Sequence, residues 1–420
     1  MSDQADGFRR VEGVAPGRLD VLGGVADYSG SLVLQMPLSL ATRVVIEERS
    51  EPGLEFSSDQ GQPVSLPMPP RDLVAPVQAD ASALRQWLDA HSVPRWVRYP
   101  LGCLTLFAAE WNWWPAGGLA FSISSDVPAS MGVSSSAALE VATLRALERL
   151  AGVSFTGTSL ARLGQRAENE VVEAPCGLMD QLASAHGRVG ELLPILCRPD
   201  VLMESVRLPP GVVAVGWPSG VRHAVADSPY ATARTAAFMG KTILERAIGR
   251  RFAYLAEARP ADVAAVSRDA LPDTMTGGEF LTRYAAIDDP QSRIDPRRTY
   301  PVRAAARFAV EENARVERLQ CVLREAQRDD REIVLSMIGE ALGESHAGYS
   351  AIGLGCPETD AMVDAIAGLG PTRGFCGARI SGGGSGGTVV VVLHERAIPA
   401  LTALANEMTA SRTDGVRILR

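Results

Sequence analysis

The sequence predicts an α+β protein of two domains. Its 420 residues exceed the length that one hydrophobic core usually serves. Stretches with helical spacing and stretches with strand-like alternation occur in both halves, without the regular strand–helix rhythm of a parallel α/β sheet. We therefore expect one domain over residues 1–205 and a second over residues 206–420.

Composition excludes several classes of protein. Hydrophobic residues make up 46% of the chain and charged residues 21%, which is typical of a folded globular protein. A formal net charge of −8 and the lack of any basic run argue against nucleic-acid binding. The polar, acidic N-terminus is no secretory signal, and no apolar window is long enough to cross a membrane. We expect a cytoplasmic protein whose six scattered cysteines stay reduced, with neither a disulfide framework nor a structural zinc site.

In the first half, apolar periodicity predicts several elements. Extended structure is expected over residues 32–46, with a break at Pro37, and loops with hairpin turns over 51–76. Residues 119–123 alternate like a strand. The helices expected here span residues 82–90, 99–114, 134–150 and 159–173, the third stopped by Gly152.

The second half mixes the same two patterns. Residues 273–298 are rich in loop-forming residues and contain the acidic run Ile287-Asp-Asp-Pro290. Strands are expected at 192–196, 211–215, 378–381 and 389–393, and helices at 230–248, 311–326, 333–345, 358–366 and 398–410.

The most informative motif is Pro128-Ala-Ser-Met-Gly-Val-Ser-Ser-Ser-Ala-Ala138, which leads into a predicted helix. Gly132 allows close backbone approach, and Ser134, Ser135 and Ser136 place hydroxyls where the helix dipole favours anions. This pattern indicates a phosphate-binding loop. A helix cap is the alternative, although a cap needs one serine and not three. Neither a Walker loop nor the protein-kinase motifs occur in the chain.

A second glycine-rich segment, Gly382-Gly-Gly-Ser-Gly-Gly387, lies between two predicted strands. A flexible hairpin would explain it. Glycines packed beside β-branched residues also favour a tight turn against something bulky, such as the serine loop and its nucleotide. We expect Gly383 and Gly384 to contact the nucleotide.

Two carboxylates and one arginine are candidates for phosphoryl-transfer chemistry. Asp180, in Cys176-Gly-Leu-Met-Asp-Gln181, is the candidate base, with a helix N-cap as the alternative. Glu168 and Ser136 could hold Mg²⁺, which takes few protein oxygens. Arg18 could keep Asp180 ionised and meet the γ-phosphate; taken alone it would be a surface ion pair.

Together these motifs resemble the GHMP kinases, the superfamily of galactokinase, homoserine kinase and mevalonate kinase, and within it the galactokinase branch. The resemblance covers nearly the whole chain and its motifs keep galactokinase order. They are residues 15–28, 128–138, Glu168 with 176–181, Arg222-His223, Tyr230, 311–315, Ser345-His346, 356–360 and 377–384.

This resemblance implies a two-domain GHMP kinase fold with ATP and sugar in the interdomain cleft. It implies that Arg18 and Asp180 are the catalytic pair. By the same resemblance, Asp27 and Tyr230 contact the sugar, and Gly177 lies beside it. The partners implied are ATP, Mg²⁺ and a small sugar; the oligomeric state is left open.

One departure from the galactokinase pattern bears on the substrate. Galactokinases carry a Glu-His pair after the signature glycine, and that Glu binds the sugar's 6-hydroxyl; this chain has Gly24 and Val25 there. A site without the partner for a hydroxyl loses that discrimination. The small, apolar position suits a pentose such as L-arabinose, which has galactose-like ring stereochemistry without C6.

Residues 15–35 and 294–303 also resemble the kinase region of plant L-arabinokinases, whose extra N-terminal region we do not expect in this chain. Asp20 replaces the usual Asn, and Met131 the usual Gly, without a predictable effect.

The sequence thus predicts an ATP- and Mg²⁺-dependent sugar 1-kinase that converts L-arabinose to L-arabinose 1-phosphate. The nearest alternative is a galactokinase, or a kinase of another hexose, a uronic acid or an unusual sugar. An alternative of another class is a catalytically inactive regulator that senses sugar and ATP.

Overall fold

The structure is a computed structural model that describes residues 8–59, 61–69, 81–174, 176–221, 229–325, 330–408 and 417–420. The chain forms two compact units, each built from separate segments. Unit 1 comprises residues 1–18, 38–129 and 134–187, and unit 2 comprises residues 19–37, 130–133 and 188–420. Our division at residue 205 assigns one continuous segment to each domain, and it stays a prediction.

The sheet of unit 1 is built on the long strand β2 (Leu32–Arg49). Thr42 to Arg49 of β2 pair antiparallel with β5 (Gly118–Ser125). Strand β3 (Leu54–Ser58) runs parallel to β5, and β4 (Gly61–Leu66) returns antiparallel to β3. Strand β1 (Arg10–Leu22) also pairs with β2.

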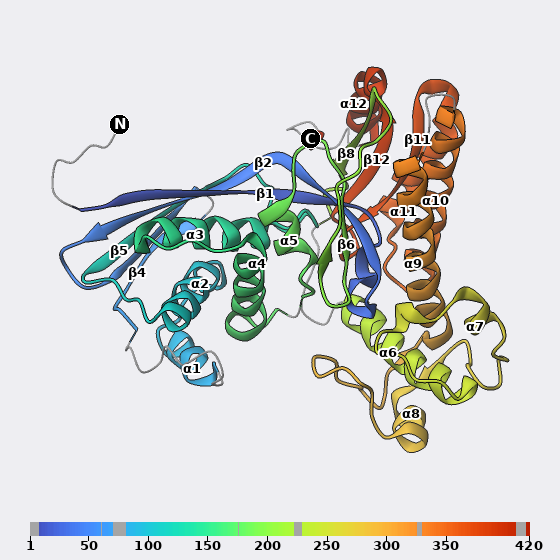
Figure 1. Cartoon of the computed structure of the whole chain (residues 1–420), viewed down its shortest axis with the longest axis horizontal. Helices are drawn as coiled ribbons and strands as arrows, with labels where there is room; N and C mark the ends of the chain where they lie inside the picture. Colours follow the sequence, from blue (N-terminus) through green and yellow to red (C-terminus); the bar gives the residue numbers. More distant parts are fainter. Residues whose placement is uncertain are drawn as a thin grey trace. The chain divides into compact units, whose positions relative to one another are not determined.

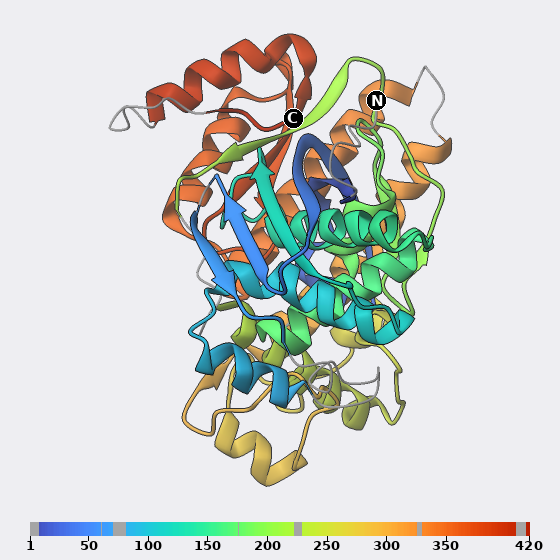
Figure 2. The ribbon, with the colours of Figure 1, turned by 90° about the vertical axis from the view of Figure 1, so that its left-hand side faces the viewer.

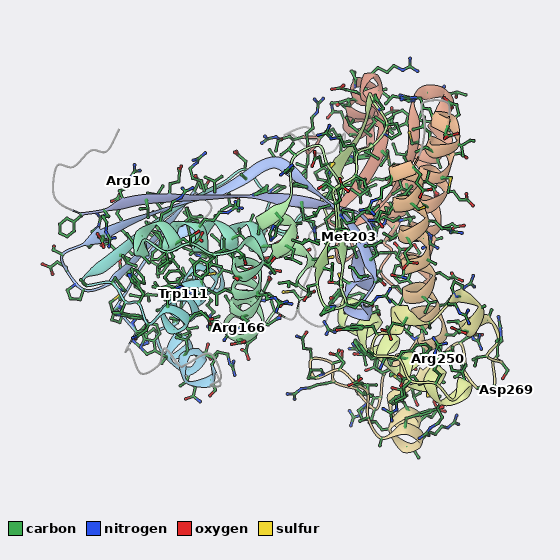
Figure 3. All side chains as sticks on the ribbon, viewed as in Figure 1. Arg10, Trp111, Arg166, Met203, Arg250 and Asp269 are labelled. Atoms are coloured by element: carbon green, nitrogen blue, oxygen red, sulfur yellow. The ribbon has the colours of Figure 1, made fainter. Side chains whose placement is uncertain are left out.

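Helices cover one face of this sheet, as Figures 1 and 2 show. They are α1 (Ser82–Ala90), α2 (Arg95–Trp111), α3 (Ser135–Ala151), α4 (Gly157–Arg166), the π-helical turn η3 (Ala167–Val172) and α5 (Met179–His186). The helical layer contains an aromatic cluster, in which Trp111, labelled in Figure 3, packs edge-on against Phe155 with 3.9 Å between ring centroids. The buried apolar faces of strands and helices form the core of unit 1.

Unit 2 contains a three-stranded antiparallel sheet in the order β11 (Phe375–Ser381), β12 (Thr388–His394) and β8 (Val212–Pro218). The helices α10 (Arg331–Ala351) and α11 (Pro357–Leu369) pack on β11, and α12 (Ile398–Met408) follows β12. Figure 1 shows α10 alongside β11. In the same unit, β6 (Leu193–Leu196) pairs with the first residues of β2 and with β7 (Val201–Leu202).

A helical layer completes unit 2. Its members are α6 (Pro229–Ile248), α7 (Pro260–Ala264), α8 (Gly277–Tyr284) and α9 (Val302–Glu325), with the short ladder of β9 (Met275–Thr276) and β10 (Thr299–Tyr300). The 3₁₀ turns are η1 (Gly24–Ser29), η4 (Leu255–Glu257), η6 (Pro371–Arg373) and η7 (Glu395–Ala397). The buried residues of α6 and α9 form a continuous core with Val25 and Ala26 of η1.

The expected α+β class is confirmed, and α1 matches the helix expected over residues 82–90. The expected break at Pro37 is wrong, because β2 runs through it. Pro37 lies between the stretch of β2 that pairs with β6 and the stretch that pairs with β5, so neither of these two ladders needs an N–H there.

All six cysteines are free thiols. Among the residues that the structure describes, no helix is long and apolar enough to cross a bilayer.

Candidate active site

Asp180 and the buried Arg18 form a partly buried ion pair in unit 1. Asp180 is the second residue of α5, and the guanidinium of Arg18, in β1, donates to Asp180 Oδ1 through Nε at 2.9 Å and Nη2 at 2.7 Å. The Arg18 side chain is 3% exposed and that of Asp180 23%. The ion pair of Arg18 is therefore not a surface ion pair. Since α5 begins at Met179, Asp180 is not its N-cap either.

Ser134 supplies the other carboxylate oxygen with a partner. Its hydroxyl donates to Asp180 Oδ2 at 2.6 Å, while its side chain makes no capping bond to α3, which it precedes. The alternative of a simple helix cap fails for this serine. Asp180 thus accepts charge-assisted hydrogen bonds on both oxygens, which fixes its orientation. Ser135 and Ser136 follow, both half-buried, in the first turn of α3.

Glu168 lies in the π-helical turn η3, an element frequent at functional sites. It is 7% exposed, and its Oε2 accepts from Gln181 Nε2 at 2.9 Å and from Cys176 Sγ at 3.4 Å. Burial, and next the negative charge of Asp180, raise the pKa of Glu168 to about 7, against hydrogen bonds that include one to Ser136. Glu168 and Ser136, the predicted magnesium ligands, are therefore neighbours.

Sequence reasoning missed Glu140, a fully buried carboxyl on α3. Gln181 Nε2 bridges it to Glu168, at 2.9 Å from Glu140 Oε2, and Glu140 Oε1 is buried without a hydrogen-bond partner in the described part of the chain. Burial, followed by repulsion from Glu168, raises the pKa of Glu140 well above its usual range. The available signal was an acidic residue on the apolar face of the helix, since such residues are rarely buried without a partner.

These groups fit the implied magnesium ion in donor chemistry. Mg²⁺ prefers oxygen ligands and takes few of them from protein, and this corner of unit 1 offers Glu168 and the Ser136 hydroxyl beside the orphaned Glu140 oxygen. No group of three or more His, Cys, Asp or Glu side chains arranged to hold a metal occurs among the described residues.

In unit 2 the glycine turn (residues 382–387) packs directly on Met131 and Gly132 of the serine motif (residues 128–138). Gly132 and Gly382 both have left-handed backbones, with φ of 71° and 72°, and a Cβ on Gly382 would lie 2.7 Å from the Gly132 carbonyl oxygen. Thr388 Oγ1 donates to the Met131 carbonyl at 2.7 Å. The glycine run does connect β11 to β12 as a hairpin, but it is packed. Gly383 is half-buried in the turn, and Gly384 (φ 77°) lies against Leu354.

Two of the predicted sugar contacts border one aromatic cluster in unit 2. Asp27 is 6% exposed and lies in η1 directly before Tyr28, whose ring meets Tyr230 edge-on at 6.0 Å. The guanidinium of Arg234 lies 5.5 Å from the Tyr28 ring centroid and binds Asp289 through two hydrogen bonds of 2.8 and 3.0 Å. This bidentate pair attaches the acidic loop to α6.

The remaining predicted contacts differ in their surroundings. Val25 is 1% exposed, within the hydrophobic core of unit 2, and Gly24 (φ 46°) faces the buried Tyr349 hydroxyl. The structure thus places both in packed surroundings. Gly177, in unit 1, is half-buried and precedes α5 by two residues. The motif Arg222-His223 lies outside the described residues.

An open groove of about 1140 Å³ runs along α9 in unit 2. None of the predicted site residues lines it. Its five arginines face four acidic residues, so the nearly balanced charge gives no preference for an anion such as ATP.

Comparison with known proteins places these motifs in a family. The model for the N-terminal domain of GHMP kinases matches residues 98–188, and the model for the GHMP kinase C-terminal domain matches residues 331–410. The chain is 33% identical to an L-arabinokinase of Arabidopsis thaliana, over 90% of this chain and 42% of that protein. It is 30% identical to a galactokinase of Streptomyces coelicolor, over 95% of this chain and 89% of that protein.

Among solved structures, the fold is similar to the crystal structure of Lactococcus lactis galactokinase complexed with galactose. The TM-score is 0.75 at 19% sequence identity, with 98% of this chain and 92% of that chain covered. The chain thus spans less than half of the plant relative and nearly all of the two galactokinases.

Proposed function

Because the chain belongs to the GHMP kinase family, we propose that it is an ATP-dependent sugar 1-kinase, with L-arabinose as its substrate and L-arabinose 1-phosphate as its product. The observation that carries the proposal is the convergence of Arg18, Ser134 and Asp180 in unit 1. A carboxylate oriented by two donors, at the start of α5 and hydrogen-bonded to Ser134 of the serine motif, is suited to receive a hydroxyl proton. The cytoplasmic location of the protein stays a prediction.

In the proposed reaction, the anomeric hydroxyl oxygen of the sugar bonds to the γ-phosphorus of ATP. The bond from that phosphorus to the bridging oxygen of ADP breaks, and the hydroxyl proton passes to Asp180. The transition state of such transfers is loose, so Asp180 orients the hydroxyl as much as it deprotonates it. Arg18 holds the carboxylate in place through two hydrogen bonds and adds positive charge beside the transferring group.

The phosphate groups of ATP are assigned to the serine motif and the glycine turn. Ser135 and Ser136 lie at the N-terminus of the 17-residue helix α3, where backbone N–H groups and the helix dipole favour anions. Gly132, Gly383 and Gly384 allow the backbone to approach the nucleotide. Glu168 and Ser136 would hold Mg²⁺, which would neutralise phosphate charge when bound.

The assignment of a pentose rests on position 24 and on one relative. Galactokinases, by the resemblance described above, use a glutamate there for the 6-hydroxyl, and this chain has Gly24 against Tyr349. The Arabidopsis relative is named an L-arabinokinase. A galactokinase, or a kinase of another hexose, uronic acid or unusual sugar, is the second candidate, supported by the Streptomyces galactokinase. A non-catalytic sensor would bind both ligands without turnover.

A coupled assay of ADP release over a panel of pentoses and hexoses tests the proposal. We expect the highest kcat/KM with L-arabinose; a higher value with galactose would overturn the pentose assignment. Binding of sugar and ATP without ADP release would identify a sensor. D180N should lower turnover by roughly 10²–10⁴-fold while ATP still binds in calorimetry. The matched control is D89N, since the exposed Asp89 pairs with Arg98 at 2.7 Å in the same unit.

A further inference from the structure

Tyr349 joins the loop after β1 to the glycine turn. It is fully buried in α10, and its hydroxyl accepts from the Val25 N–H at 3.0 Å and donates to the Gly382 carbonyl at 2.8 Å. Phe308 packs edge-on against its ring at 5.4 Å, and the Arg379 guanidinium lies 4.8 Å from the ring centroid. The hydroxyl is therefore fixed through both its donor and its acceptor capacity.

Tyr349 also occupies the place of a side chain at position 24. A Cβ built on Gly24 would lie 1.8 Å from Tyr349 Oη, 2.7 Å from Asp20 Oδ2 and 2.9 Å from Arg379 Nη2. The first distance is far below van der Waals contact, and the ring that carries the oxygen is packed on all sides. No side chain at position 24 can coexist with this tyrosine.

The surroundings of Gly24 are suited to an acidic group that this chain lacks. Arg379 is completely buried and pairs with Asp20 through Nη1 at 3.0 Å. Its Nε and Nη2 are buried without hydrogen-bond partners in the part of the chain that the structure describes. A carboxylate at position 24 would meet these unused donors if the phenol ring were absent and the Asp20 carboxylate, 2.7 Å from that Cβ, shifted aside.

The same contacts fix the position of Asp27. The Gly23 N–H donates to Glu312 Oε1 at 3.0 Å, and the Val25 N–H donates to Tyr349, so the loop is held at two points from outside itself. Asp27 follows two residues later in the turn η1. Asp27 is therefore separated from the Tyr349 contact by only two residues of backbone.

We propose that Tyr349 is a positioning residue for sugar specificity, matched to Gly24: it fixes the loop that carries Asp27 and excludes an acidic side chain from position 24. This inference rests on the proposed sugar kinase function. Its consequence is that a sugar with a hydroxymethyl arm finds no carboxylate partner, whereas a pentose needs none.

The first test compares Y349F with Y300F. Tyr300 is also buried, and its hydroxyl accepts one hydrogen bond, from the Asp295 N–H at 2.9 Å, so both variants lose buried hydrogen bonds. We expect Y349F to raise the KM for L-arabinose by about tenfold, with the KM for ATP changed less than about twofold. Y300F should leave both values unchanged. An unchanged sugar KM in Y349F, or a rise in the ATP KM alone, overturns the proposal.

The second test is a double-mutant cycle of G24D, Y349L and G24D/Y349L, read by thermal unfolding. Aspartate is chosen because it tolerates positive φ better than most residues. We expect G24D to lower Tm steeply in the presence of Tyr349 and Y349L to restore part of that loss, because the ring no longer fills the space. If G24D is insoluble and G24D/Y349L is soluble, this rescue supports the pairing in the same way. Additive losses, or an insoluble double variant, contradict the pairing.

The sugar panel then distinguishes a failure of the specificity role of Tyr349 from a failure of the proposed kinase function. The double variant should show a higher ratio of galactose to L-arabinose kcat/KM than the wild-type protein. An unchanged ratio overturns the role of Tyr349 in specificity. A wild-type protein that phosphorylates no sugar overturns the proposed function instead, and the Tm cycle still reports on the pair.

Discussion

Ser134 donates a hydrogen bond of 2.6 Å to Asp180 and makes no capping bond to the helix that it precedes. Its backbone is left-handed, with φ 56° and ψ 48°, whereas a capping serine has extended dihedral angles. The hydroxyl is therefore turned towards α5. This conformation separates a role in catalysis from a role in helix stability, and the two roles can be measured independently.

Replacing Ser134 by alanine should lower kcat, because Asp180 loses the donor to its Oδ2, while the capping of α3 is not affected. A hydrogen bond to a charged group contributes about 1.5–3 kcal/mol, so we expect a loss of roughly 10- to 150-fold in turnover. The matched control is T156A, because Thr156 does cap α4 by accepting from the Ser159 N–H at 3.1 Å. T156A should cost about 1 kcal/mol of stability without loss of turnover. Unchanged turnover in S134A, or an equal loss of turnover in T156A, would refute the distinction.

Replacing Arg18 by lysine should reduce kcat by roughly 100-fold, because one ammonium cannot reproduce two directed N–H donors. Steady-state kinetics with saturating sugar and ATP measure this loss. The control is R98K, at the pair with the exposed Asp89, which should keep wild-type kinetics. A fully active R18K enzyme would show that the geometry of the guanidinium is not required.

Replacing Glu168 by glutamine should raise the Mg²⁺ concentration needed for half-maximal turnover by at least tenfold, since changes around a metal site typically cost 10- to 100-fold in affinity. Magnesium titrations at fixed ATP would detect the shift. E170Q is the control, because Glu170 lies on the same turn but pairs with Arg166 at 2.9 Å. Equal Mg²⁺ requirements in wild type and E168Q would exclude Glu168 as a ligand.

Replacing Asp20 by asparagine should destabilise the protein by about 3 kcal/mol, because a fully buried Arg379 would lose its counter-charge. Urea unfolding measures the difference. The exposed pair of Arg268 and Asp273 offers the comparison, and D273N should cost less than about 1 kcal/mol. A D20N variant as stable as D273N would mean that the hydrogen bonds of Asp20 matter and its charge does not.

His186 should make stability fall in mild acid. Burial, and next the charge of Arg145, lower its pKa in the folded protein below the usual 6.5. The unfolded chain therefore binds more protons than the folded one between that lowered pKa and 6.5, and stability is lost as pH falls through this window. The free energies of unfolding of the wild-type protein and of H186Q, measured with denaturant, should converge or cross between pH 8 and pH 5. A constant difference over that range would contradict the prediction.

Local patterns were enough for much of the fold. The helices α1 and α3 were predicted within one residue of their ends, because apolar spacing and the glycine at position 152 are signals within one element. The start of α9 at Val302 was missed, although Pro301 before it is a start signal. Pro37 was over-interpreted because its effect depends on which neighbouring strands require its N–H.

The candidate site was predictable where residue type carries the chemistry. Arg18, Ser134 and Asp180 were each proposed for phosphoryl transfer, and the structure brings them together. Glu140 and Tyr349 were not proposed, because both lie on helices whose spacing indicates only packing. Their contacts come from residues far away in the chain, and nothing near them in the sequence marks those partners.

The partners of Asp20 bear on how the protein is made. Arg379 follows Asp20 by 359 residues, and Ser381, which accepts from the Asp20 N–H, comes later still. Contacts between residues so far apart in the sequence form slowly, because the long intervening chain loses entropy when its ends are brought together. During translation the segment around Asp20 emerges early and stays without these contacts until the last strands leave the ribosome. A nascent chain arrested before β11 would carry the whole of unit 1, and yet its segment around Asp20 would lack these contacts and be exposed to chaperones and proteases.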